Sequence, residues 1–187
     1  MRNLPNLISL LRLAMAPLML VLAWLQQPWW FITALAVSGF SDVLDGYLAR
    51  RLNAISELGS RLDSWGDFAV YSTMAVGAWL LWPETVQQYR LWIIMVVASF
   101  TVPVAIGLIK FRSLTSYHTW SVKIAVLLTF IGYVLLFTGI TDWPFRLAAL
   151  VCLLAALEEI AITLLLRHQY VDIRSVRQAW KHHRSLR

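Results

Sequence analysis

Long apolar runs separated by short polar breaks dominate the pattern of the chain. A helix needs about 20 apolar residues to cross a bilayer, and several runs approach or reach that length. The breaks contain Pro, Gln, Thr and charged residues, which are typical of turns. The pattern therefore predicts an all-α integral membrane protein with six transmembrane helices. The first span ends near Leu25, and the other five cover residues 29–51, 58–82, 91–109, 120–140 and 145–166.

The two ends of the chain differ in character from the spans. Residues 1–12 place their apolar side chains on one helical face, which predicts an interfacial helix that continues into the first span. Residues 167–187 are polar and basic, and they predict a cytoplasmic tail with a surface helix. Neither a second domain nor an internal repeat of the inverted-repeat transporter type is visible. Residues 1–187 are thus expected to form one membrane domain.

The composition supports insertion into a membrane. Of the 187 residues, 59% are hydrophobic and ten are Trp, and the mean hydropathy is +0.66. A soluble core cannot bury that much apolar surface, whereas a bilayer can. The single cysteine, Cys152, lies in an apolar run, which excludes a disulfide framework and indicates a packing role.

The net charge of +6 is carried by particular loops and by the tail. In a soluble protein such a charge would suggest nucleic-acid binding, but here the cations indicate topology and contacts with anionic lipid headgroups. No nucleic-acid partner is expected. If both termini are cytoplasmic, only Arg90 and Arg146 of the sixteen Lys and Arg residues lie in outward loops. Cytoplasmic loops are enriched in these residues, so the charges predict cytoplasmic termini.

Four aspartates interrupt the second and third predicted spans, at positions Asp42, Asp45, Asp63 and Asp67. Each carboxylate placed in hydrocarbon costs roughly 2.5–3.5 kcal/mol on insertion scales, so the four need a compensating partner. Each pair is spaced by three or four residues and projects from one helical face. Two antiparallel helices would bring all four together, where one or two divalent cations would relieve their repulsion. Oxygen ligands favour Mg²⁺ or Mn²⁺, and Mg²⁺ is often shared with a substrate phosphate.

Small residues and an arginine flank the aspartates. Gly46, Ala49 and Gly59 would allow a bulky polar group to approach the helix backbone closely. Arg50 offers a guanidinium group suited to phosphate. The glycines would equally serve close packing between membrane helices. Both interpretations stay open on the spacing alone.

These residues together match a family pattern. The sequence Asp-x2-Asp-Gly-x2-Ala-Arg-x8-Gly-x3-Asp-x3-Asp runs from Asp42 to Asp67 and resembles the signature of the CDP-alcohol phosphatidyltransferases. All eight fixed positions of that signature are present. Residues 3–12, Asn-Leu-Pro-Asn-Leu-Ile-Ser-Leu-Leu-Arg, are similar to the start of bacterial phosphatidylglycerophosphate synthases. Six spans also agree with the family's fold.

The resemblance implies a membrane enzyme of phospholipid biosynthesis that transfers a phosphatidyl group from CDP-diacylglycerol to a small alcohol and releases CMP. It implies two divalent cations, Mg²⁺ or Mn²⁺, held by Asp42, Asp45, Asp63 and Asp67, with Asp67 as the base for the acceptor hydroxyl. It further implies a CDP site lined by Asp42, Gly46, Ala49, Arg50, Gly59 and Asp63. The expected location is the bacterial inner membrane with the active site facing the cytoplasm, and family members often form homodimers.

The acceptor alcohol is less well defined, because two features usual in phosphatidylglycerophosphate synthases are missing. Those enzymes usually have Asp-Pro-x-Ala-Asp-Lys where residues 63–68 read Asp-Ser-Trp-Gly-Asp-Phe, and an Arg-Glu pair where residues 101–104 read Thr-Val-Pro-Val. Glycerol 3-phosphate is the favoured acceptor, with serine, inositol, inositol phosphate or another polyol as alternatives. The candidate acceptor-binding residues are Lys110, Arg112, His118, Lys123, Glu158 and Glu159.

Each acceptor candidate also has a structural interpretation. Lys110, Arg112 and Lys123 could bind phosphate or mark the cytoplasmic boundary of their spans. A buried glutamate at position 158 or 159 could pair with Lys123 or bind hydroxyls or an amine of the acceptor. His118 could contact phosphate or lie at the membrane interface.

Two other classes of function are compatible with carboxylates inside a membrane. A cation channel or transporter would distribute polar residues across the bilayer, but here the acidic cluster lies at one membrane face and the outer halves of the spans are almost wholly apolar. An inactive scaffold would commonly lack a metal ligand, yet the motif is complete. The sequence therefore favours an enzyme.

Overall fold

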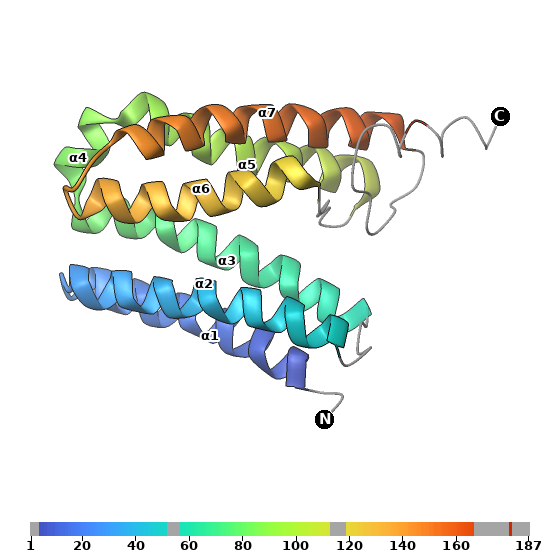
Figure 1. Cartoon of the computed structure of the whole chain (residues 1–187), viewed down its shortest axis with the longest axis horizontal. Helices are drawn as coiled ribbons and strands as arrows, with labels where there is room; N and C mark the ends of the chain where they lie inside the picture. The colour runs from blue at the N-terminus through green and yellow to red at the C-terminus, as the bar shows by residue number, and fades with distance from the viewer. Residues whose placement is uncertain (1–3, 52–56, 113–118, 167–179, 181–187) are drawn as a thin grey trace. The chain divides into compact units, whose positions relative to one another are not determined.

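The computed structural model describes residues 4–51, 57–112, 119–166 and 180, with side chains for residues 10–41, 65–112, 119–166 and 180. Within these ranges the chain is helical and contains no strand. Seven helices follow one another along these residues (Figure 1). They are α1 (Leu4–Trp24), α2 (Pro28–Arg51), α3 (Glu57–Leu81), α4 (Pro83–Gln88), α5 (Arg90–Phe111), α6 (Trp120–Phe137) and α7 (Trp143–Leu165).

The all-helical fold class predicted from the sequence is confirmed for the described residues. The six predicted long segments correspond to all helices except α4, with bounds shifted by at most three residues. The predicted interfacial start and the first span form one continuous helix, α1, which contains Pro17. The short α4 was not predicted. It begins with Pro83 and has Glu84 in its first turn. Both residue types are favourable at a helix N-terminus.

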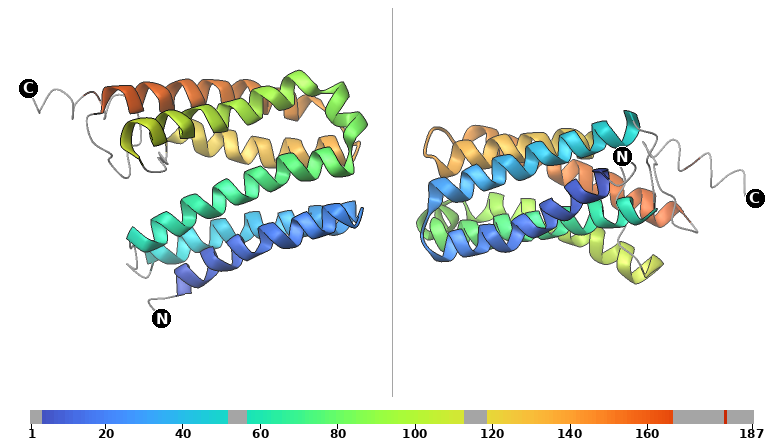
Figure 2. Two further views of the ribbon diagram at one scale, coloured as in Figure 1. Left: turned by 180° about the vertical axis from the view of Figure 1, so that it is seen from behind. Right: turned by 90° about the horizontal axis from the view of Figure 1, so that it is seen from below.

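The chain forms two compact units, Met1–Val86 and Gln87–Arg187. In the first unit, α1 packs against both α2 and α3, and in the second unit α7 packs against both α5 and α6. Figure 2 shows the three long helices of each unit from two further directions. In both units the first and third helices run in the same direction and the middle helix runs antiparallel to them.

The core of the first unit is built around Phe31, whose side chain is fully buried. A Cβ atom added at Gly77 of α3 would lie 2.3 Å from Cζ of Phe31, so only glycine at this position leaves room for the ring. The ring of Phe31 also meets Trp82 edge to face, with 6.2 Å between the ring centroids. At the same end of the unit, Nε2 of Gln26 donates to the carbonyl of Leu80 over 3.0 Å, which ties the α1–α2 turn to α3.

Small residues bring the helices of the second unit close together. Ala148 and Ala149 on α7 are fully buried. A Cβ atom at Gly132 would lie 2.7 Å from Cα of Phe145, so α6 and α7 approach almost to backbone contact. The side chains of Thr129 and Cys152 hydrogen-bond across the same interface over 3.1 Å. Small residues and short polar contacts of this kind are typical of packing between membrane helices.

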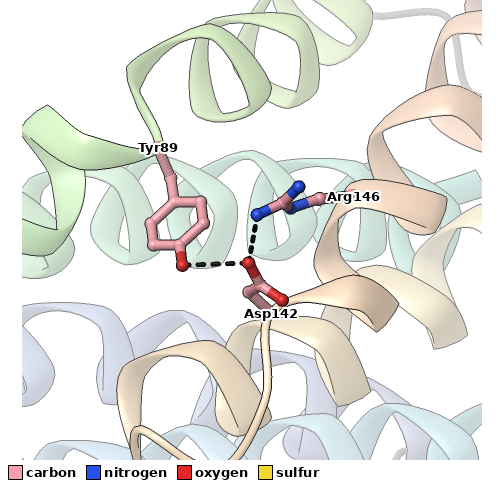
Figure 3. A network of polar contacts seen from close by, with 3 residues as sticks. All are labelled: Tyr89, Asp142 and Arg146. Carbon is pink, nitrogen blue, oxygen red and sulfur yellow. Dashed lines mark hydrogen bonds and ion pairs between the residues drawn. The ribbon is translucent and has the colours of Figure 1, made fainter.

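A polar contact joins the α4–α5 turn to the α6–α7 turn (Figure 3). The hydroxyl of Tyr89 donates to the carboxylate of Asp142 over 2.9 Å, and Arg146 pairs with the same carboxylate. The guanidinium of Arg146 also lies 5.6 Å from the ring centroid of Tyr89. The hydrogen bond from Tyr89 and the charge of Arg146 both hold the pKa of Asp142 below its ordinary value.

Three of the described helices, α5, α6 and α7, are long and apolar enough to cross a membrane. Large apolar side chains are exposed along them, including Ile109, Leu127 and Leu154. Exposure of so many large apolar residues is unfavourable in water but expected against lipid. The second unit is therefore membrane-embedded. The helices α2 and α3 are as long, with 24 and 25 residues, but carry the charged residues of the motif.

Candidate active site

The aspartate motif lies on two antiparallel helices of the first unit (Figure 1). Asp42 and Asp45 lie near the end of α2, and Asp63 and Asp67 lie in the first half of α3. The backbone is helical at all four positions, so each pair is separated by about one helical turn, as predicted. Residues 52–56, which connect the two helices, lie outside the described part of the chain.

The remaining motif positions lie on the same two helices. Gly46, Ala49 and Arg50 fall in the last turns of α2, and Gly59 falls in the first turn of α3. The side chains of these residues and of the first three aspartates lie outside the described side chains. Their roles as metal ligands and CDP contacts therefore stay predictions. The structure shows that the four aspartate positions fall on two antiparallel helices of one unit.

Asp67 is the one motif aspartate whose side chain is described. Its side chain is 35% exposed, and its Oδ1 lies 3.7 Å from Nη1 of Arg12. The side chain of Arg12 is only 2% exposed, although it comes from an otherwise apolar stretch of α1. A charge is costly inside an apolar helix packing unless an opposite charge lies nearby. The ion pair with Asp67 offsets part of the cost of burying this arginine in α1.

Gly66 provides the space that the arginine occupies. A Cβ atom at position 66 would lie 2.9 Å from Nε and 3.2 Å from Nη2 of Arg12. The guanidinium of Arg12 therefore occupies the space beside Gly66 on α3, next to the residue that bears the carboxylate. Sequence reasoning placed Arg12 in the interfacial start and missed this contact. The available signals were a lone cation within an apolar helix and a glycine directly before the last aspartate.

Two predicted acceptor-binding cations have other contacts in the second unit. Nζ of Lys110 donates to the carbonyls of Thr163 and Leu164, each over 2.9 Å, and so caps the C-terminus of α7. Arg112 is exposed and adopts a left-handed conformation with φ of 56° at the end of α5. Its backbone N–H donates to the carbonyl of Leu108 over 2.9 Å. Both residues have structural roles, which do not test binding of an acceptor.

Two of the other acceptor candidates, Lys123 and Glu158, have contacts at the start of α6. The hydroxyl of Ser121 donates to the carboxylate of Glu158 on α7 and also hydrogen-bonds the fully buried Thr119 over 2.8 Å. The contact found for Glu158 is thus with Ser121, whereas Nζ of Lys123 lies 5.3 Å from the ring centroid of Trp120. Glu159 is half-buried, and His118 lies outside the described residues.

Comparison with known protein families shows which family the chain belongs to. The family model for CDP-alcohol phosphatidyltransferase matches residues 2–165, which include all seven described helices and the whole aspartate motif. The chain belongs to the CDP-alcohol phosphatidyltransferase family. The resemblance seen in the aspartate motif is thereby confirmed. No solved structure matches the chain.

Several curated proteins are similar to this chain. A cardiolipin synthase (CMP-forming) of Streptomyces coelicolor is 41% identical over 103 residues, which are 50% of this chain and 44% of that protein. A CDP-diacylglycerol–glycerol-3-phosphate 3-phosphatidyltransferase of Cereibacter sphaeroides is 30% identical over 144 residues, 70% of this chain and 64% of that protein. The enzyme of the same name from Pseudomonas fluorescens is 41% identical over 68 residues, 35% of each chain. The chain thus spans less than two thirds of the length of the curated relatives it matches.

Proposed function

We propose that the protein transfers a phosphatidyl group from CDP-diacylglycerol to glycerol 3-phosphate, forming phosphatidylglycerophosphate and releasing CMP. The observation that carries this proposal is the complete aspartate motif on two antiparallel helices of a chain that belongs to the family. Two of the similar proteins carry this activity in their names, and a third is named as a cardiolipin synthase that forms CMP.

In this proposal the donor site is built by α2 and α3. Asp42, Asp45, Asp63 and Asp67 hold two divalent cations, Mg²⁺ or Mn²⁺, and the CDP moiety lies along Gly46, Ala49, Arg50 and Gly59. When bound, the cations would neutralise the diphosphate and the charge on departing CMP. The helices supply only oxygen donors at the four aspartates, which fits these cations better than zinc or copper.

The proposed chemistry is a displacement at the phosphorus of the phosphatidyl group. Asp67 accepts the proton of the acceptor hydroxyl, and the hydroxyl oxygen forms a bond to that phosphorus. The bond from phosphorus to the bridging oxygen of the diphosphate breaks, and CMP leaves with the electron pair. Arg50 binds a phosphate of the donor, because its guanidinium can donate two parallel hydrogen bonds to phosphate oxygens.

The acceptor site is proposed to lie among the polar residues of the second unit. Lys123 and Arg112 are the cations available for the phosphate of glycerol 3-phosphate, with His118 as a further contact. Lys110 already donates to two carbonyls of α7, so we assign it a structural role rather than a contact with the acceptor. Glu158 and Glu159 would bind acceptor hydroxyls, and Ser121 already holds Glu158 in place.

The proposal includes six membrane spans, α1, α2, α3, α5, α6 and α7, in a bacterial inner membrane. Both termini and the aspartate motif would face the cytoplasm, because only two of the sixteen Lys and Arg residues would then lie outside. An impermeant maleimide should label cysteines placed at Gln26 and Gln87 in intact cells, and lack of labelling would contradict this topology.

We also propose that the protein forms a homodimer. The mass of the protein in detergent tests this.

The product of the reaction tests the proposal. Purified protein with Mg²⁺ and CDP-diacylglycerol is given glycerol 3-phosphate, phosphatidylglycerol, serine or inositol in parallel, and the lipid products are identified by mass. We expect phosphatidylglycerophosphate with glycerol 3-phosphate and little product with the others. Formation of cardiolipin from phosphatidylglycerol would instead indicate the activity named for the Streptomyces relative. CMP release with none of the alcohols, in folded protein, would contradict the proposed function.

A further inference from the structure

We propose that Arg12 of α1 is a positioning residue that fixes the carboxylate of Asp67, and that Gly66 is required for this role. The inference rests on the proposed function, in which Asp67 is the base. It adds a residue from outside the aspartate motif to the catalytic machinery. It also makes α1 part of the active site rather than only a membrane anchor.

The burial of Arg12 indicates that it acts through another residue. Its side chain is 2% exposed, so the guanidinium does not offer a surface to a substrate phosphate. The charged group lying closest to it among the described ion pairs is the carboxylate of Asp67, with 3.7 Å between Nη1 and Oδ1. Arg12 is therefore placed to affect the carboxylate rather than the substrate.

The geometry of the ion pair is compatible with the proposed role of Asp67 as a base. The separation of 3.7 Å is longer than an ordinary hydrogen bond, so the attraction is that of an ion pair. A carboxylate has two oxygens and can accept from different partners at once. Attraction of Oδ1 towards α1 is thus compatible with Oδ2 accepting a proton or binding a cation. Arg12 would select the rotamer of Asp67 without consuming the carboxylate.

Gly66 fixes the position of the guanidinium from the other side. A Cβ atom at position 66 would come within 2.9 Å of Nε, closer than such contacts normally are. Any larger residue must therefore displace the guanidinium, and the carboxylate one residue further along α3 would lose its neighbour. The guanidinium presents several donors in a rigid plane, whereas the ammonium group of lysine is a single point of charge on a flexible stem. The site should thus prefer arginine over lysine.

The test compares steady-state CMP release by wild type, Arg12→Met, Arg12→Lys, Gly66→Ala and the double variant Arg12→Met with Gly66→Ala. A displacement of about 1 Å in a catalytic group can reduce the rate on the order of 100-fold, so we expect such a loss of kcat in Arg12→Met. The KM for CDP-diacylglycerol should change little, because Arg12 does not touch substrate. Arg12→Lys should recover part of kcat, and Gly66→Ala should lose part of it.

Coupling between the two sites separates positioning from a structural role. If Gly66 acts through Arg12, Gly66→Ala should reduce kcat in the wild type but have little effect in Arg12→Met. The control is Met19→Ala, because Met19 is fully buried on the same helix and lies about two turns beyond Arg12. It should lower the thermal unfolding midpoint in detergent while kcat is kept.

Three results would overturn the inference or its basis. Wild-type kcat in folded Arg12→Met would contradict positioning by Arg12. Effects of Arg12→Met and Gly66→Ala that multiply in the double variant would show that the two residues act independently. A wild-type protein that releases no CMP with any alcohol would contradict the proposed function itself, which the acceptor panel detects before any variant is made.

Discussion

Single residues set how closely the helices of the first unit approach one another. Phe31 is fully buried, and its ring lies where the side chain of residue 77 would otherwise be. Interiors are packed too densely to absorb an extra methyl group without displacement of a neighbour. The same arrangement recurs at Gly66, where the neighbour is the guanidinium of Arg12 rather than an aromatic ring. Glycines on α3 therefore decide both the stability of the unit and the placement of a charge.

Gly77→Ala should destabilise the protein, because the new Cβ would lie 2.3 Å from Cζ of Phe31. Overpacking of this kind typically costs about 1–3 kcal/mol. The measurement is the thermal unfolding midpoint in detergent for Gly77→Ala and for Val76→Ala, whose side chain is 47% exposed on the same helix. The loss caused by Gly77→Ala should shrink when Phe31→Leu is present. An equal loss in both backgrounds would show that the ring is not the cause.

At the scale of helices, the sequence predicted the long elements well because proline and polar breaks separate them. The first residues of α2 and α4 are prolines, and Pro144 follows the first residue of α7. The short α4 was missed because its six residues read as one polar break. The contact between Arg12 and Asp67 was missed because it depends on how α1 is rotated against α3. Hydrophobic pattern in a membrane does not fix that rotation, since lipid-facing and buried positions are both apolar.

Lys110 illustrates the same limit, because its position predicted either a phosphate contact or a boundary marker. The structure gives it a third role, since its Nζ donates to two carbonyls at the C-terminus of α7. A cation at this end of a helix is favourable, because the last carbonyls lack partners and carry partial negative charge. The side chain thereby links the ends of α5 and α7, which are parallel neighbours in the second unit (Figure 1).

Lys110→Met should loosen the last turn of α7. A hydrogen bond from a charged donor contributes roughly 1.5–3 kcal/mol, so local opening should become at least tenfold more frequent. Hydrogen exchange of the Leu166 amide, which donates to Ile162 over 3.1 Å, measures this directly. Lys123→Met is the matched control, because Nζ of Lys123 lies over Trp120 instead of a helix end. Unchanged exchange together with a raised KM for glycerol 3-phosphate alone would assign Lys110 to the acceptor instead.

At the scale of the whole molecule, we propose that the residues that bind the donor and those that bind the acceptor belong to different units. The first unit carries the motif that defines the family, and the family model extends from it through the second unit to residue 165. The sequence predicted the family and the helices that carry the motif, because these depend on residues within a 26-residue stretch. The roles of the motif residues in binding the donor stay predictions. The acceptor half of the reaction was harder to predict, because its candidates are spread from Lys110 to Glu159 and the contacts of the described ones depend on tertiary packing.

The central claim is that the four aspartates hold divalent cations for phosphatidyl transfer, with Asp67 as the base. The most direct measurement is CMP release from CDP-diacylglycerol and glycerol 3-phosphate by wild type and Asp67→Asn, each with Mg²⁺, with Mn²⁺ and after chelation. We predict release by the wild type only with a divalent cation, and none by Asp67→Asn in protein that remains folded in detergent. The unfolding midpoint of Asp67→Asn should fall, because the buried Arg12 loses its counter-charge. Near-wild-type release by Asp67→Asn, or release that persists in a chelator, would contradict it.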